Sequence, residues 1–174
     1  MAVRQILTEP NKILRQKSLL VEKVDAELQK LMDDMLETMY AAPGIGLAAI
    51  QVGVPKRVIV LDIAQKEGQK NPMYFIKPEI VDKSKNHSTY EEGCLSVPGQ
   101  FAEIDRPDQC FVKYLDNNGE PREINAQGML ATCIQHEMDH LEGILFIDYL
   151  SKLKKSMIVK KLSKQQKALE RIVF

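Results

Sequence analysis

The segments with strand-like character lie together in the middle of the chain, between two regions of helical periodicity. Residues 57–63 form a short run rich in β-branched residues, and a second apolar run, Met73 to Val81, contains Pro78. Proline lacks the amide hydrogen that a sheet ladder needs, so this run is expected at a sheet edge or a bulge. Residues 110–115 and 121–125 flank a glycine-bearing turn and predict a hairpin. Because helices do not alternate with these strands, the pattern favours an α+β fold.

The helical regions are marked by apolar residues that recur every three or four positions. A first helix is predicted to begin at Val24-Asp25 and to end within residues 41–44, and a second runs from Met129 to Leu141 with Gly143 just beyond it. A third, rich in lysine, is expected from Ser151 to Arg171, with its charges facing solvent. The apolar stripe of the first helix is interpreted as core: Leu28, Leu31, Met32, Met35, Leu36 and Met39.

Length and charge exclude several classes of protein. The 174 residues suit a single domain spanning residues 1–174 with a sizeable core. The 24 basic residues balance the 24 acidic ones, which argues against direct, sequence-specific binding of nucleic acid. No apolar run approaches the roughly 18 residues that span a bilayer. The N-terminus lacks the pattern of a secretory signal, so we expect a cytoplasmic protein without a membrane partner.

The segment 135–140, Gln-His-Glu-Met-Asp-His, carries the strongest chemical signal. On a helix, His136 and His140 share one face about a turn apart, so their imidazoles can hold one divalent metal. Glu137 is then placed to reach a water beside that metal and to act as general base or acid. Because two of the three histidines fall at this spacing, a metal site is favoured. The third, His87, is interpreted as a surface loop residue.

A hydrolytic metal usually has three protein ligands, and the histidine pair supplies two. Cys94 is the better upstream candidate for the third, because a thiolate is a strong, soft ligand. A lone buried cysteine is more often structural, so the residues alone leave this open. Downstream of His140, Glu142 would face away on the helix, and no spacing singles out Asp148 or Glu170.

The segment 44–51, Gly-Ile-Gly-Leu-Ala-Ala-Ile-Gln, predicts a close approach of its backbone to another part of the chain. It lacks the Gly-Lys-Ser/Thr of a phosphate-binding loop. From the residues alone we favour a tight turn into a strand, with Gln51 near the start of that strand. The functional alternative is that the Gln51 amide donates to a developing oxyanion.

These segments together resemble the three motifs of the peptide deformylase family. Gly-x-Gly-Leu-Ala-Ala-x-Gln matches residues 44–51, Glu-Gly-Cys-Leu-Ser matches 92–96 and Gln-His-Glu-x-Asp-His matches 135–140, without substitution and in the family's order. Because it lacks long insertions, the chain most resembles the shorter bacterial members of the family. The resemblance implies small antiparallel or mixed sheets packed around a central metal-binding helix, with N- and C-terminal helices. It also implies hydrolysis of the formyl group from the N-terminal formyl-methionine of nascent polypeptides, with release of formate.

The resemblance further implies a role for each motif residue. Cys94, His136 and His140 become the ligands of one divalent metal, with Fe²⁺ expected physiologically and Zn²⁺, Ni²⁺ or Co²⁺ able to replace it. Glu137 becomes the general base and acid, while Gln51 and the backbone N–H of Leu95 form an oxyanion hole. The partners are N-formylmethionyl nascent peptides, together with a transient contact of the lysine-rich C-terminal helix with the ribosome. The methionine pocket is expected at four positions, although the periodicity equally allows core residues there: Ile45, Gly46, Met129 and Cys133.

Two positions depart from the family pattern, and one nearby residue agrees with it. Phe101 stands where many bacterial relatives have a basic residue, and Thr132 where they often have an aliphatic one. Arg106 matches an arginine common in the family and is expected to pair with Glu92 or Asp139, with a plain surface salt bridge as the alternative.

Two other hypotheses remain at this point. A metalloprotease with the same histidine motif would need a histidine or glutamate as its third ligand. A structural metal module would need a fourth protein ligand.

Overall fold

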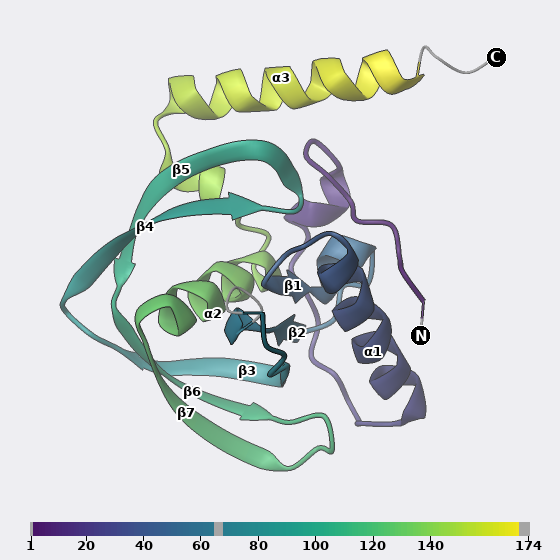
Figure 1. The fold of residues 1–174 in the computed structure, drawn as a ribbon, viewed down its shortest axis with the longest axis vertical. Coiled ribbons are helices and arrows are strands. Elements are labelled where there is room, and N and C mark those ends of the chain that lie inside the picture. The colour runs from purple at the N-terminus through teal and green to yellow at the C-terminus, as the bar shows by residue number, and fades with distance from the viewer. Residues whose placement is uncertain (1, 65–67, 171–174) are drawn as a thin grey trace.

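The computed structural model of the protein describes residues 2–64 and 68–170. The α-helices are α1 (Ala26–Ala41), α2 (Gly128–Leu141) and α3 (Lys152–Glu170), with short 3-10 helices η1 (Lys12–Arg15), η2 (Ala49–Val52) and η4 (Phe146–Tyr149). The strands are β1 (Gly46–Ala48), β2 (Val58–Leu61), β3 (Met73–Lys83), β4 (His87–Cys94), β5 (Val97–Pro107), β6 (Gln109–Leu115) and β7 (Pro121–Gln127). This order confirms the α+β class (Figure 1).

The strands of the described residues form two antiparallel sheets. The larger has the order β1-β2-β3-β6-β7, and β4 pairs with β5 in a separate hairpin. Helix α2 lies between the two sheets, while α3 crosses beyond the β4–β5 hairpin (Figure 1). The expected central helix between small sheets is therefore present.

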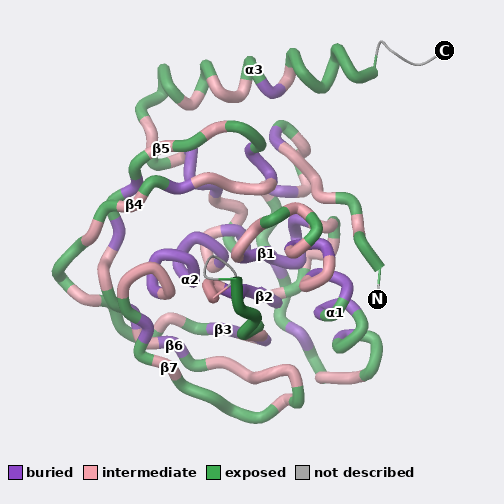
Figure 2. Tube along the Cα trace, viewed as in Figure 1, coloured by how far each residue is buried: buried purple, intermediate pink, exposed green. Residues whose placement is uncertain are grey.

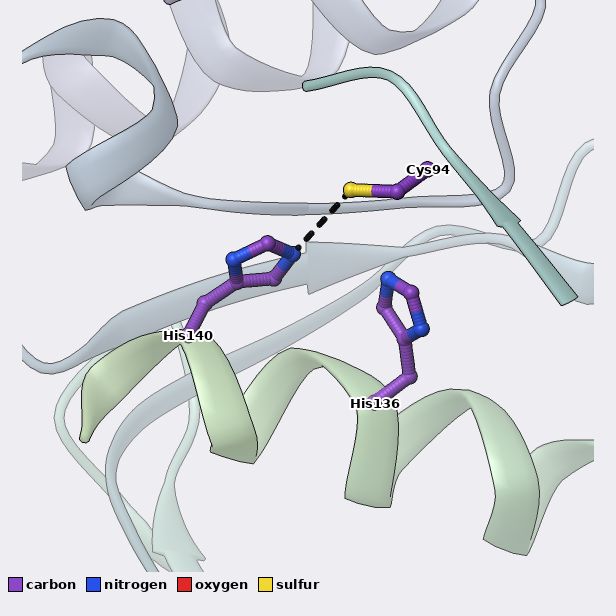
Figure 3. A group of neighbouring side chains, drawn as sticks. All are labelled: Cys94, His136 and His140. Carbon is purple, nitrogen blue, oxygen red and sulfur yellow. Dashed lines mark hydrogen bonds between the residues drawn. The ribbon is translucent and has the colours of Figure 1, made fainter. Parts of the chain in front are cut away.

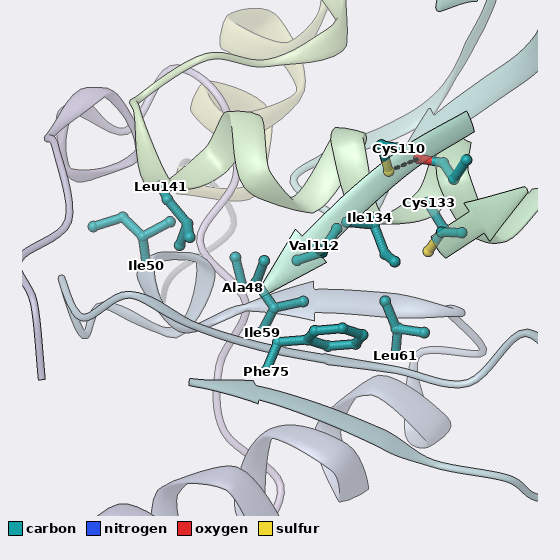
Figure 4. Packing of buried hydrophobic residues seen from close by; sticks show 12 residues of the cluster. Ala48, Ile50, Ile59, Leu61, Phe75, Cys110, Val112, Cys133, Ile134 and Leu141 are labelled. Atoms are coloured by element: carbon teal, nitrogen blue, oxygen red, sulfur yellow. Dashed lines mark hydrogen bonds between the residues drawn. The ribbon is translucent and has the colours of Figure 1, made fainter. Parts of the chain in front are cut away.

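Strand β2 shows why the larger sheet holds a helix on each face. Its four residues are all buried, because alternate side chains point to opposite sides of a strand. Val58 and Val60 pack in a cluster with the apolar stripe of α1. Ile59 and Leu61 pack in a second cluster with residues of α2, such as Ile134 (Figure 4). Figure 2 shows the resulting run of buried residues through α2 and the strands beside it.

The predicted first helix is confirmed, with Asp25 as its N-cap. The Asp25 carboxylate accepts a hydrogen bond of 2.9 Å from the backbone N–H of Leu28, which satisfies one of the free donors at the helix start. Of the predicted core stripe, Leu36 is half-buried and the other residues are buried. The predicted third helix is also present, although Arg171 lies outside the described residues.

The proline-containing run forms β3, and Pro78 lies at a break in its pairing. The register of β3 with β6 shifts between Ile76 and Glu79, and Lys77 adopts a positive φ of 50°. The missing proline donor is thus accommodated by a bulge rather than at a sheet edge. The hairpin predicted over residues 110–125 is confirmed as β6 and β7. Residues 65–67, between β2 and β3, lie outside the described residues.

The β4–β5 hairpin is the part of the fold that the sequence patterns missed. Its strands lack a regular alternation of polar and apolar residues, because β4 contains the adjacent Glu91 and Glu92 and β5 begins with Val-Pro-Gly. The interpretation of His87 as a loop residue was wrong, because it begins β4, where its exposed ring lies 3.0 Å from the Asp105 carboxylate. Among the described helices, none combines the length and apolar character needed to cross a membrane.

Gly143 provides a test of how α2 is joined to the N-terminal segment. It has a φ of 75°, and a β-carbon at this position would overlap the carbonyl group of Arg15. We expect Gly143→Ala to lower the free energy of unfolding by about 3 kcal/mol, from left-handed strain and a backbone clash together.

Gly99→Ala is the matched control, because Gly99 has the same φ of 75° but no heavy atom within 4 Å of the added carbon. Only the strain remains there, so a loss of about 1 kcal/mol is expected. Denaturant unfolding of both variants measures the difference. Equal losses would contradict the clash.

Candidate metal centre

Helix α2 and the end of strand β4 bring a thiol and two imidazoles together. His136 and His140, one turn apart, point from α2 toward Cys94, the last residue of β4 (Figure 3). One ligand atom from each of the three lies within 4.8 Å of the others, and Cys94 Sγ is 3.4 Å from His140 Nε2. Cys94, which the residues alone left open, therefore joins the histidine pair. Among the described residues, this is the group that could hold a metal ion.

The orientation of His136 is fixed from behind by a carboxylate. Its Nδ1 lies 2.8 Å from Oε1 of Glu92, and this carboxylate favours a proton on Nδ1, which leaves the lone pair of Nε2 available to a metal. Arg106 holds Glu92 in turn, with Nε and Nη2 donating to its two oxygens at 2.7 and 2.9 Å. The remaining nitrogen of Arg106, Nη1, donates to Oδ2 of Asp139 at 2.9 Å. Arg106 therefore pairs with both of the expected carboxylates. Its guanidinium group is buried, so the pairing is not a surface salt bridge.

Charge complementarity keeps these groups ionised despite their burial. Burial, the largest influence on Glu92, raises the pKa of its carboxyl, but the hydrogen bonds from His136 and Arg106 outweigh it and hold that pKa below its usual range. The same carboxylates raise the pKa of Arg106 against the opposing effect of burial. Tyr149 also belongs to this network of hydrogen bonds. Its hydroxyl donates to Asp139 at 2.7 Å, and Arg106 lies over its ring. No sequence signal pointed to Tyr149.

The donor set fits a single divalent metal. One thiol and two imidazole nitrogens are ligands typical of zinc and of first-row transition metals, and three protein ligands leave a position for a reactant. The buried Nδ1 of His140 has no hydrogen-bond partner in the described structure, while the His140 Nε2 faces Cys94. Downstream acids are engaged elsewhere: Glu142 pairs with Arg57, and Asp148 pairs with Arg15.

Glu137 lies beside this group, with its Oε1 4.0 Å from Nε2 of His136. The side chain is buried, and burial raises its pKa to about 7. Its Oε2 has no hydrogen-bond partner in the described structure. A β-carbon at Gly46 would lie 2.6 Å from Glu137 Oε1, so the glycine allows strand β1 to approach the carboxylate. A β-carbon at Gly44 would meet Leu95 in the same way, which confirms the predicted close approach.

Gln51 follows strand β1 on the 3-10 helix η2, not at the start of a strand as expected. Its Oε1 accepts a hydrogen bond of 2.9 Å from the backbone N–H of Ala48. Its Nε2 faces the metal group, at 3.0 Å from Ser96 Oγ and 3.6 Å from Cys94 Sγ. The short strand and the following turn thus carry the amide to the edge of the centre.

A cavity of about 600 Å³ opens beside the centre. Phe101 lies at its rim with 65% of its surface exposed, and Thr132 lies in its wall. Cys133 and Ile45 also line the cavity, and the thiol of Cys133 lies 4.0 Å from the carbonyl oxygen of Ile45. The cavity is lined by nearly all the residues that the sequence analysis assigned to the site, with the exception of His140: Ile45, Gly46, Gln51, Cys94, Leu95, Met129, Cys133, His136 and Glu137.

Comparison with known proteins identifies the family. The family model described as "Polypeptide deformylase" matches residues 3–156. The chain is 69% identical to the peptide deformylase of Pelagibacter ubique over 94% of this chain and 95% of that protein, and 59% identical to that of Phenylobacterium zucineum over 97% and 99%. The crystal structure of the Ehrlichia chaffeensis peptide deformylase in complex with actinonin superposes with a TM-score of 0.91 at 49% identity, covering 95% of this chain and 98% of that one.

A Legionella pneumophila peptide deformylase gives a TM-score of 0.90 at 44% identity, covering 99% of this chain and 100% of that one. Fold, motif geometry and sequence therefore agree over almost the full length. The chain belongs to the peptide deformylase family.

Proposed function

We propose that this protein hydrolyses the formyl group from the N-terminal formyl-methionine of nascent polypeptides and releases formate. The observation that carries the proposal is the convergence of a thiol, two imidazoles, a buried carboxyl group and a side-chain amide beside one cavity. The family to which the chain belongs supports the same activity.

Each residue has a role that its position supports. Cys94, His136 and His140 would hold a divalent metal, which when bound lowers the pKa of water and polarises a carbonyl group. Glu137, with a pKa raised to about 7, takes a proton from the attacking water and delivers it to the leaving amine. Gln51 and the backbone N–H of Leu95 donate to the formyl oxygen as negative charge develops there. One such donor contributes about 3–4 kcal/mol to transition-state stabilisation.

The substrate's methionine side chain is proposed to occupy the apolar part of the cavity that is lined by Ile45, Gly46, Met129 and Cys133. Met129 and Cys133 are one helical turn apart and lie on the part of α2 that precedes the histidines. This position on α2 supports a side-chain pocket next to the group that is proposed to act on the formyl carbon.

The function is tested by formate release from a formyl-Met-Ala-Ser peptide. The acetyl-Met-Ala-Ser peptide is the matched control, because it differs by one methyl group at the reacting carbon. Formate release that depends on bound metal is the expected result. Absence of formate from a metal-loaded sample would overturn the proposal.

Glu137→Gln tests proton transfer. The amide is nearly isosteric and preserves the packing against Gly46, but it cannot accept and deliver a proton. We expect a loss of about 10²–10⁴-fold in kcat with metal content unchanged. A variant that binds metal normally and keeps its kcat would show that another group moves the proton.

Cys94→Ala tests the metal set without any activity measurement. We propose ferrous iron as the physiological ion, so elemental analysis of anaerobically purified protein is expected to give about one iron per chain. The variant is expected to lose most of this metal. Cys110→Ala is the control, because Cys110 is buried in the core and burial raises the pKa of its thiol to about 11. Equal metal content in both variants would remove Cys94 from the ligand set.

We also propose that α3 contacts the ribosome transiently in the cytoplasm, where nascent chains are made. Helix α3 carries seven lysines and one acid between Lys152 and Glu170, and Leu162 is its buried residue. A solvated row of lysines is attracted to the phosphates of ribosomal RNA without reading their sequence.

Charge reversal of Lys160, Lys161 and Lys164 to Glu is expected to abolish co-sedimentation with ribosomes at low salt. Formate release from the free peptide should stay unchanged, because α3 does not line the cavity. Co-sedimentation equal to that of the unmodified protein would exclude this helix as the contact.

A further inference from the structure

Ser96 is a buried residue to which the proposed reaction gives no role. It is the second residue of the turn between β4 and β5, and its side chain is completely buried. Its Oγ accepts a hydrogen bond of 3.0 Å from Nε2 of Gln51, a residue that is itself 1% exposed. A hydroxyl group of the turn therefore meets the amide that is placed to stabilise the formyl oxygen.

The contacts of Gln51 fix which end of its amide faces the centre. The backbone N–H of Ala48 is only a donor, so the group 2.9 Å from it must be the amide oxygen. The NH₂ group then faces Ser96 Oγ on one side and Cys94 Sγ, 3.6 Å away, on the other. With one N–H donated to Ser96, the second N–H is directed toward the metal ligands and the cavity.

The main chains of both residues are held by the same N-terminal segment. The backbone N–H of Leu7 donates to the carbonyl oxygen of Gln51 at 2.7 Å, and that of Glu9 donates to the carbonyl oxygen of Ser96 at 2.8 Å. Ser96 also directly follows Leu95, which supplies the second proposed oxyanion donor. The Gln51–Ser96 contact therefore links the two segments that carry the proposed oxyanion donors.

We propose that Ser96 is a positioning residue, whose hydroxyl group holds the Gln51 amide with one N–H aimed at the formyl oxygen. The inference rests on the proposed function. Without this hydroxyl, the amide can rotate about its last side-chain torsion, which is broad in glutamine, and the donor is no longer preorganised. The alternative is that Ser96 serves only as a turn residue.

A double-mutant cycle separates the two roles. Ser96→Ala is expected to lower kcat about tenfold with KM changed less than about twofold, as for one lost hydrogen bond. Gln51→Ala alone should lower kcat about 100-fold. In the Gln51→Ala background, Ser96→Ala should change kcat by less than about twofold, because the residue acts through that amide. An equal tenfold effect in both backgrounds would show a turn role and overturn the proposal.

The matched control is Ser88→Ala, on strand β4 of the same hairpin. Its buried Oγ has no hydrogen-bond partner in the described structure, so kcat should stay unchanged. Thermal unfolding and metal content of every variant verify that the fold is intact. If Ser96→Ala does not fold, Ser96→Gly makes the same test, since it also lacks the hydroxyl group.

A second readout does not depend on activity. In zinc-loaded protein labelled with ¹⁵N-glutamine, the Gln51 side-chain NH₂ should exchange slowly with solvent, and its signal is assigned by its loss in Gln51→Ala. Ser96→Ala should make this exchange at least about tenfold faster. Unchanged exchange would overturn the positioning role, whereas a wild-type protein that releases no formate would overturn the proposed function instead.

Discussion

The metal centre depends on the buried Arg106, which holds the carboxylates of Glu92 and Asp139 beside the polar face of α2. His136, Glu137 and His140 are all buried, although they belong to residue types that are costly to remove from water. Arg106 stabilises this arrangement, because its positive charge lies between the carboxylates of Glu92 and Asp139 and keeps Glu92 ionised to accept a hydrogen bond from Nδ1 of His136. Removing one member of such a pair leaves an uncompensated buried charge, which typically destabilises a protein by about 3–5 kcal/mol.

The rest of the fold holds this helix from both sides. On its apolar side, Ile134 and Leu141 pack with the face of β2 formed by Ile59 and Leu61. On its polar side, the β4–β5 hairpin brings Cys94 to the histidines and Glu92, which Arg106 holds, to His136. The separation of the two sheets therefore has a functional consequence, because one sheet supplies packing and the other supplies the third ligand.

Close contacts between distant segments bring the remaining groups into the site. Gly46 allows β1 to lie against Glu137, and Gly44 allows the same segment to lie against Leu95. The N-terminal segment then hydrogen-bonds to the main chains of Gln51 and Ser96. The proposed electrostatic donors thus sit on rigid supports, which is the condition under which such donors act most strongly on a transition state.

The sequence by itself determined the local features, because they depend on spacing along one element. The histidine pair, Glu137, the N-cap at Asp25 and the apolar stripe of α1 all follow from helical periodicity, and the three motifs together indicated the family.

Only the tertiary structure decided which distant residues meet. Periodicity did not reveal β4 and β5, because they form a partly exposed hairpin with a weak pattern, and so Cys94 remained one candidate among several. The tertiary structure likewise brings Tyr149 to Asp139 and Ser96 to Gln51. Their contacts join residues 10 and 45 positions apart, and such contacts arise only when the packing of α2 against both sheets fixes the distances.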